Sequence, residues 1–176
     1  PADPSLTTVD TQRGGDYDIR RLRLSRAIRK NMVVQARNPG VRLPHHEESI
    51  VINAPVGSVF AAMTDIERWN EWWPQIQNVR LQNGWTVNGA MDCRVMGMDL
   101  NGSVTVYDPD RELGFETKLP VGGRVLQHFT FTSENSGTRL TAEMDASGVA
   151  GMMFTKKRLL KELNKLKTNV ENAEPG

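Results

Sequence analysis

The chain has 176 residues, of which 38% are hydrophobic and 24% charged, and its formal net charge is +1. This length accommodates one well-buried domain with an appendage, and the composition is that of an ordinary globular protein. No apolar run approaches the roughly 18 residues that a membrane span requires, which argues against an integral membrane protein. The single cysteine, Cys93, cannot form an internal disulfide; together with the absence of a secretory leader pattern, it predicts a cytoplasmic location.

The charge is unevenly distributed along the chain. Residues 1–47 carry nine Lys and Arg against five Asp and Glu, whereas residues 48–148 carry seven against thirteen. A nucleic-acid-binding domain would carry a basic face on its folded part. The acidic middle segment therefore argues against nucleic acid as a partner.

Residues 1–47 are predicted to be a basic N-terminal extension that is flexible or binds a protein partner. Residues 1–18 show no periodic apolar pattern, a helix is predicted over 19–34, and residues 44–47 have the composition of a linker. Peripheral contact with a membrane is the weaker alternative, because the segment has no aromatic anchor. The predicted partner-binding residues are Arg20, Arg21, Arg23, Arg26, Arg29 and Lys30.

A packed domain is predicted over residues 48–176. A run of β-branched residues predicts a first strand over 49–53. Pro55 suits the first turn of a helix, which is expected over 56–64.

A second short helix follows, and Pro74 stops it. Trp69, Trp72 and Trp73 stand at positions i, i+3 and i+4 of this helix, so their indoles project from one face. Such a face covers either the protein's own core or the mouth of a cavity. Both roles are open, and they are compatible.

Six further strands are predicted from alternating apolar residues bounded by turn signals. Their short connections make them an antiparallel meander with one apolar face. The strands are expected over residues 77–82, 90–95, 100–108, 113–119, 124–133 and 138–146.

A long helix over residues 151–172 closes the domain, with Leu159, Leu163 and Leu166 on one face. A twisted sheet that is apolar on one side needs a helix laid across it. A ligand would occupy the gap between this helix and the sheet.

Over residues 48–172 the chain resembles the START-like, Bet v 1-like (SRPBCC) superfamily, in particular polyketide cyclase/dehydrase-type proteins. The segments that carry the resemblance are residues 50–60 (IVINAPVGSVF), 64–69 (TDIERW), 72–74 (WWP), 108–111 (DPDR) and 137–141 (GTRLT). The resemblance implies an α+β helix-grip fold. In that fold a seven-stranded antiparallel curved sheet wraps around a long C-terminal helix, and two short helices follow the first strand.

Three functions are compatible with this resemblance, because one scaffold hosts many sites. The first is the binding of a hydrophobic small molecule, such as a lipid, isoprenoid or polyketide, between the C-terminal helix and the sheet. The second is an accessory subunit that docks on a larger assembly through residues 1–47. The third is a polyketide cyclase or dehydratase, which needs an acid or base in the cavity. No inward-facing acid or base is evident in the sequence, so no catalytic residue is predicted.

The predicted ligand contacts lie on apolar faces of the elements or at an opening placed at residues 152–154. Methionine adapts to irregular surfaces, which suits a cavity for a flexible ligand, although ordinary core filling is an open alternative. Tyr107 would face the cavity together with Ser103 and Thr105, and Tyr107 and Gln127 would orient the ligand. The predicted ligand-binding residues are Trp69, Trp72, Trp73, Met91, Tyr107, Phe115, Gln127, Phe129, Phe131, Met144, Met152 and Met153.

Other polar residues receive structural interpretations. His128 alternates with Gln127 and Phe129, which predicts a surface or interface histidine on the outer face rather than a general base. Asp92 and Arg94 are predicted to form a surface pair. Adjacent side chains in the His-His-Glu-Glu run at residues 45–48 rarely converge on one ion, so neither a metal nor a cofactor is expected.

Overall fold

The computed structural model describes residues 45–120, 122–148 and 150–173. The helix predicted over 19–34 and the basic partner-binding residues of the extension lie outside the described residues. The division into an extension and a domain therefore stays a prediction.

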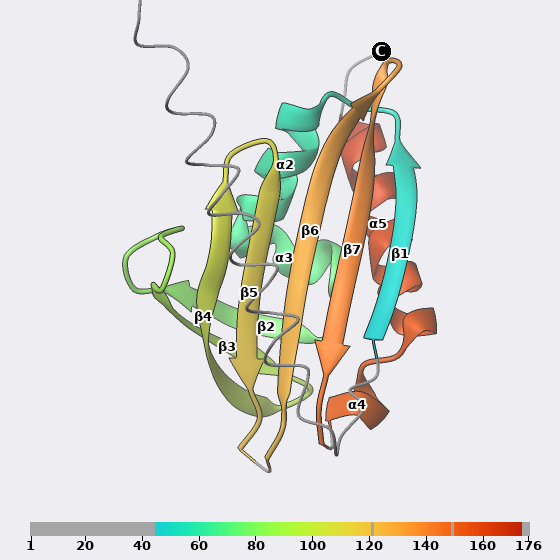
Figure 1. Ribbon diagram of the computed structural model, residues 1–176. Coiled ribbons are helices and arrows are strands. Elements are labelled where there is room, and N and C mark those ends of the chain that lie inside the picture. Colours follow the sequence, from blue (N-terminus) through green and yellow to red (C-terminus); the bar gives the residue numbers. More distant parts are fainter. Residues whose placement is uncertain (1–44, 121, 149, 174–176) are drawn as a thin grey trace, which may run out of the picture. The chain divides into compact units, whose positions relative to one another are not determined.

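Within the described residues, the strands form one antiparallel sheet in the order β1-β7-β6-β5-β4-β3-β2 (Figure 1). The meander predicted from sequence is confirmed, and β1 joins it by pairing with β7, the last strand in the chain. The strands are β1 (His45–Ile52), β2 (Ile76–Leu81), β3 (Ala90–Val95), β4 (Met98–Asp108), β5 (Glu112–Lys118), β6 (Arg124–Glu134) and β7 (Gly137–Ala146).

The first strand begins earlier than predicted. Residues 45–47, expected to be linker, pair with β7 in register, with His45 opposite Asp145. Main-chain pairing does not depend on apolar side chains, so a polar run can extend an edge strand.

Helices cover one face of the sheet (Figure 1). None of the described helices is both long and apolar enough to cross a membrane. The helical elements are α2 (Val56–Thr64), the 3₁₀ turn η1 (Ile66–Arg68), α3 (Trp69–Trp72), α4 (Ala150–Met153) and α5 (Lys156–Ala173).

The long C-terminal helix is interrupted, contrary to the prediction of one helix over 151–172. It consists of α4 and α5, separated at Phe154 and Thr155. In a straight helix, at roughly 100° per residue, Phe154 would project about 180° away from Leu163. Both side chains are buried, and the interruption is what allows Phe154 to join the same core.

Alternation along the strands separates the core from the outer face, as predicted. On β3, Met91, Cys93 and Val95 are buried in the core, whereas Asp92 and Arg94 point away from it. These inner-face side chains form one core cluster with the apolar residues of α2, α3 and α5.

One register shift changes a predicted face. On β4, a bulge between Val104 and Val106 places Tyr107 opposite Leu113 on the inner face, as predicted. Ser103 instead lies opposite Glu116, whose strand neighbours Phe115 and Thr117 are buried. The expectation that Ser103 shares the face of Tyr107 is therefore wrong, because a bulge inserts an extra residue between them.

Candidate functional site

The three clustered tryptophans join the short helices to the sheet. Trp69, Trp72 and Trp73 are all buried, and the ring of Trp69 lies 5.8–5.9 Å from those of the other two. The Trp69 ring also lies 5.4 Å from that of Phe115 on β5. Aromatic pairs at these separations add favourable contact energy to the burial of their apolar area. The core role considered for these residues is thus present in the structure.

The indole N–H groups of the tryptophans are not equivalent. Trp69 Nε1 donates to the main-chain oxygen of Met63, and Trp85 Nε1 donates to that of Thr64, each at 2.8 Å. Both acceptors lie at the C-terminal end of α2. By contrast, Trp72 Nε1 and Trp73 Nε1 are buried without a hydrogen-bond partner in the described part of the chain. A buried donor left in this state costs about 1–3 kcal/mol, so an incoming acceptor would be stabilised here.

A pocket of about 210 Å³ reaches one of these tryptophans from outside. It lies between α2, α3 and the C-terminal half of α5; Trp72, Leu166 and Val170 contribute apolar wall. At its rim Arg68 and Glu71 form two hydrogen bonds, of 2.9 and 2.8 Å. Pockets for small molecules usually measure roughly 300–1,000 Å³, so this one admits only part of such a ligand as it stands.

A second hollow, of about 440 Å³, lies beside η1 and β2. Trp69 and Ile76 contribute apolar surface to it, whereas Asn70, Gln77 and Asn78 make most of its wall polar. Neither hollow lies between α5 and the inner face of the sheet, which is where the ligand was predicted to bind.

The residues predicted to contact a ligand converge on the helix-covered side of the sheet, with one exception. Met152 is 83% exposed on α4, so its side chain lines no interior space. Tyr107 and Met153 are partly buried against the core. The remaining nine are buried: Trp69, Trp72, Trp73, Met91, Phe115, Gln127, Phe129, Phe131 and Met144. These side chains pack together, and their role as ligand contacts stays a prediction.

An ion pair on the buried side of α5 was missed from the sequence. Arg158 Nε donates to Glu162 Oε1 at 3.1 Å, and the Glu162 side chain is only 9% exposed. Burial disfavours the carboxylate and raises the pKa of Glu162 to about 7, although Arg158, Lys165 and Lys161 oppose the shift. The available signal was the position of Glu162 on the apolar stripe, three residues after Leu159.

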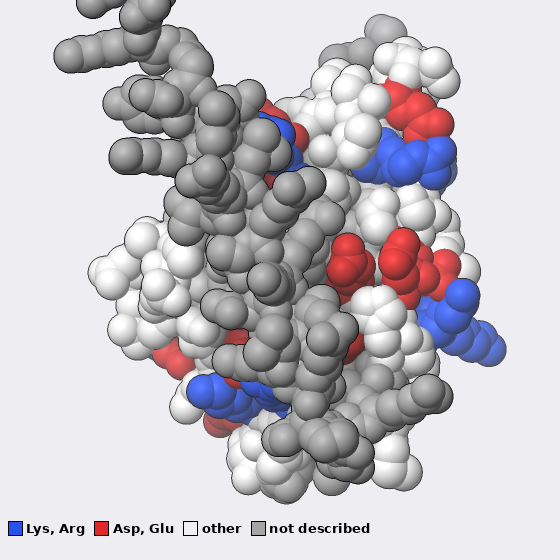
Figure 2. Space-filling model, in the orientation of Figure 1, with Lys and Arg blue, Asp and Glu red and all other residues white. Residues whose placement is uncertain are grey.

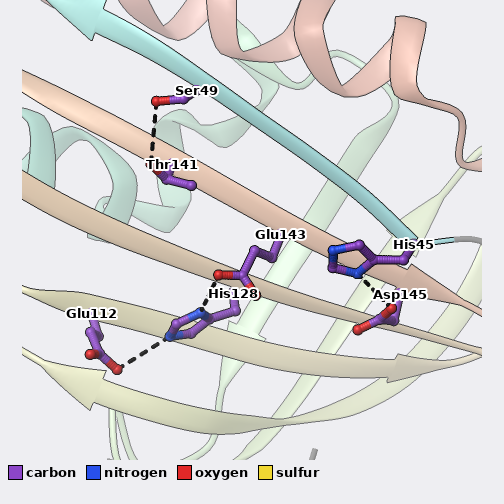
Figure 3. Close-up of polar contacts among 7 residues, drawn as sticks. All are labelled: His45, Ser49, Glu112, His128, Thr141, Glu143 and Asp145. Carbon is purple, nitrogen blue, oxygen red and sulfur yellow. Dashed lines mark hydrogen bonds and ion pairs between the residues drawn. The ribbon is translucent and has the colours of Figure 1, made fainter. Parts of the chain in front are cut away.

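The outer face of the sheet carries its own polar cluster (Figure 3). His128 Nε2 lies 3.3 Å from Glu112 Oε2, and its Nδ1 lies 3.8 Å from Glu143 Oε1. Burial alone would lower the pKa of His128, but hydrogen bonds to Glu112 and Glu143 outweigh it and raise the pKa to about 9. The predicted outer face is correct, whereas a surface position is wrong, because His128 is only 4% exposed.

The rest of the described outer face shows ordinary surface pairing. Both acidic and basic side chains are visible on this side of the molecule (Figure 2). Arg94, predicted to pair with Asp92, instead lies 3.7 Å from Asp99 across the β3–β4 turn. The His-His-Glu-Glu run alternates between the two faces of β1, and His45 Nδ1 lies 2.9 Å from Asp145 Oδ1. Such half-exposed pairs contribute little to stability.

These features place a curved sheet, short helices and a final helix around an apolar interior with a few buried polar groups. Residues 44–171 match the family described as polyketide cyclase/dehydrase and lipid transport. The chain belongs to this family. The family model covers every described element except the last two residues of α5.

Solved structures of similar fold agree with that assignment. Protein MLL2253 from Mesorhizobium loti superposes with a TM-score of 0.64 at 17% identity, covering 75% of this chain and 100% of that one. Ara h 8.0201 has a TM-score of 0.60 at 10% identity, covering 74% and 99%. The Aha1 dimer protein from Colwellia psychrerythraea has a TM-score of 0.60 at 16% identity, covering 76% and 100%. At these identities the likeness establishes the fold alone. A search of curated protein sequences finds no match.

Proposed function

We propose that the protein binds a hydrophobic small molecule with an acceptor oxygen, in the interior beside Trp72 and Trp73. The observation that carries the proposal is that both of these indole N–H groups are buried and unpartnered in the described part of the chain. A carbonyl, hydroxyl or carboxylate oxygen of a ligand would satisfy a donor that the fold leaves unsatisfied.

The apolar surroundings supply the affinity in this proposal. Each Å² of apolar ligand surface taken out of water is worth roughly 25 cal/mol. Met63, Met91 and Met144 are buried in the same core cluster as the tryptophans. Unbranched methionine side chains rearrange at low cost, so they are the groups expected to yield space to a ligand.

Entry is proposed through the pocket between α2, α3 and α5. Trp72 belongs to both the pocket wall and the core cluster. In this proposal the Trp72 indole moves to let the ligand pass from the pocket into the core. Membership of a family described by polyketide chemistry and lipid transport supports an apolar ligand over a polar one.

The accessory-subunit alternative depends on residues 1–47, of which 1–44 lie outside the described residues. No observation on the described residues favours it over ligand binding.

Calorimetric titration with a fatty acid, an isoprenoid quinone and an aromatic polyketide tests the proposal. Trp72→Phe and Trp73→Phe each keep a large ring but remove one unpartnered N–H. We expect each variant to weaken binding of the preferred probe by roughly tenfold, the equivalent of one net hydrogen bond.

Trp85→Phe is the matched control, since the N–H of Trp85 is already bonded to Thr64. Its affinity for the probe should stay within about twofold of the unmodified protein. Absence of binding for all three probes, or equal weakening in all three variants, would contradict the proposal.

A further inference from the structure

The N-terminal half of α5 holds a guanidinium group in a fixed position. Besides its bond to Glu162, Arg158 donates from Nη1 to the main-chain oxygen of Met153 and to Met96 Sδ, each at 3.3 Å. The Arg158 guanidinium also lies over the ring of Phe154, with its carbon 5.6 Å from the ring centroid. Contacts from α4, α5 and the β3–β4 turn therefore orient this side chain.

One donor of this oriented group is left over. Arg158 Nη2 is buried and has no hydrogen-bond partner among the described residues. Nε donates to Glu162 and Nη1 to Met153 and Met96, so Nη2 is the part of the guanidinium that is left for a ligand. A carboxylate oxygen is a strong acceptor for such a charged donor.

This donor lies at the end of the fold where the tryptophan segment enters the sheet. Met96, which contacts Arg158, donates from its main-chain N–H to the oxygen of Gln75 at 3.1 Å. Gln75 lies two residues after Trp73. Met96 therefore links Arg158 to the connection between α3 and β2.

We infer that Arg158 and Glu162 form the head-group site of the proposed ligand and select an apolar acid that binds there through its carboxylate and meets Trp72 or Trp73 with a further oxygen. The inference rests on the proposed function, because it assumes that the tail of the ligand occupies the interior. The Arg158 side chain is 18% exposed and that of Glu162 9%, so a head group held by them would lie between solvent and the core. Arg158 Nη2 donates to one carboxylate oxygen, and protonated Glu162 can donate to the other.

The nearby charges fix how binding depends on pH. Lys161 and Lys165 stand on α5 with Glu162, and Arg94 pairs with Asp99 beside the β3–β4 turn. The Cys93 thiol on β3 stays neutral, since burial raises its pKa to about 11. A bound carboxylate repels ionised Glu162, so binding takes up a proton at that residue and strengthens as the pH falls from about 8 to about 6.

Laurate and its matched alcohol are the probes, because they share a tail and differ in the head. For the unmodified protein at pH 6, we expect laurate to bind at least roughly tenfold tighter than the alcohol. Arg158→Gln should abolish this preference, because it weakens laurate binding more than binding of the alcohol. Glu162→Gln should keep laurate binding and remove its pH dependence.

The outcomes distinguish the head-group site from apolar binding in general. Equal binding of laurate and the alcohol, or a laurate preference that survives in Arg158→Gln, would overturn the head-group site while leaving apolar binding in place. Failure of both probes to bind the unmodified protein would overturn the proposed aliphatic ligand as well. Circular dichroism checks that Arg158→Gln is folded. Arg158→Lys, which keeps the charge but not the planar guanidinium, should retain only part of the preference for laurate.

Discussion

The indole Nε1 of Trp69 donates a hydrogen bond of 2.8 Å to the main-chain oxygen of Met63, and both residues are completely buried. This bond ties α3 to the last turn of α2. The next indole on the same face, that of Trp72, has no such acceptor in the described structure. The N–H of Trp69 is thus used within the fold, whereas the N–H of Trp72 remains available to an incoming acceptor.

The first prediction compares two identical substitutions. Trp69→Phe deletes a satisfied donor and leaves the Met63 oxygen without its partner, whereas Trp72→Phe deletes a donor that was already unpartnered. Urea unfolding should show a larger loss for Trp69→Phe, by about 1–3 kcal/mol. Equal losses in the two variants would show that the hydrogen bond adds nothing to ring packing.

The second prediction concerns the pH dependence that Glu162 imparts. Its pKa is raised from 4.5 to about 7 in the folded state, so the folded protein holds a proton that the unfolded chain has released. The contribution of Glu162 to stability is therefore fully present below about pH 4.5. It is lost as the pH rises toward 7, which lowers the free energy of unfolding by on the order of 2–3 kcal/mol.

Glu162→Gln should remove this component. The variant's free energy of unfolding, relative to the unmodified protein, should rise between pH 4.5 and 8. A difference between the two proteins that stays constant over this range would show that Glu162 titrates normally.

The third prediction concerns His128, whose contribution to stability is also lost as the pH rises, but over a higher pH range. Its pKa is raised from 6.5 to about 9, so the ionised ring stabilises the fold fully below about pH 6.5. This stabilisation, on the order of 2–3 kcal/mol, is lost as the pH rises from 6.5 through 9.

His128→Gln should accordingly be destabilised at pH 6 and nearly neutral at pH 10, as measured by urea unfolding. His45→Gln is the control on the same face, because its pair with Asp145 is half exposed and should contribute little at either pH. A His128→Gln deficit that is the same at both pH values would contradict the charged cluster.

The fourth prediction concerns the single cysteine. Burial, with a smaller contribution from Asp92, raises the pKa of Cys93 from 9.0 to about 11. A shift of two units lowers the thiolate fraction at pH 8 roughly a hundredfold, and access is restricted as well. A disulfide reagent should therefore label the native protein slowly and the urea-unfolded chain rapidly. Immediate labelling of the native protein would mean that the core opens on that timescale.

Much of the fold could be predicted from sequence because its elements are local. Each strand of the meander is bounded by turn residues and alternates between an apolar and a polar side, as Met91, Cys93 and Asp92 do on β3. The interruption at Phe154 could not be predicted in this way. It results from the burial of that side chain against distant elements, which no local periodicity records.

The candidate site was predicted less well, because its chemistry depends on what each polar group meets in space. Periodicity placed Trp69 and Trp72 on one face but could not show that, of these two, Trp69 alone bonds to the end of α2. Glu162 stood visibly among leucines, yet its raised pKa follows from burial and from its pairing with Arg158. The bulge on β4 similarly separated Tyr107 from Ser103.

Native mass spectrometry of the full chain, purified gently from the cells that produce it, tests the central claim most directly. We expect an excess mass that organic solvent removes, and accurate mass of the released molecule should identify an apolar compound with an acceptor oxygen. A chain that carries no excess mass, and that also fails to take up the probes after delipidation, would contradict ligand binding.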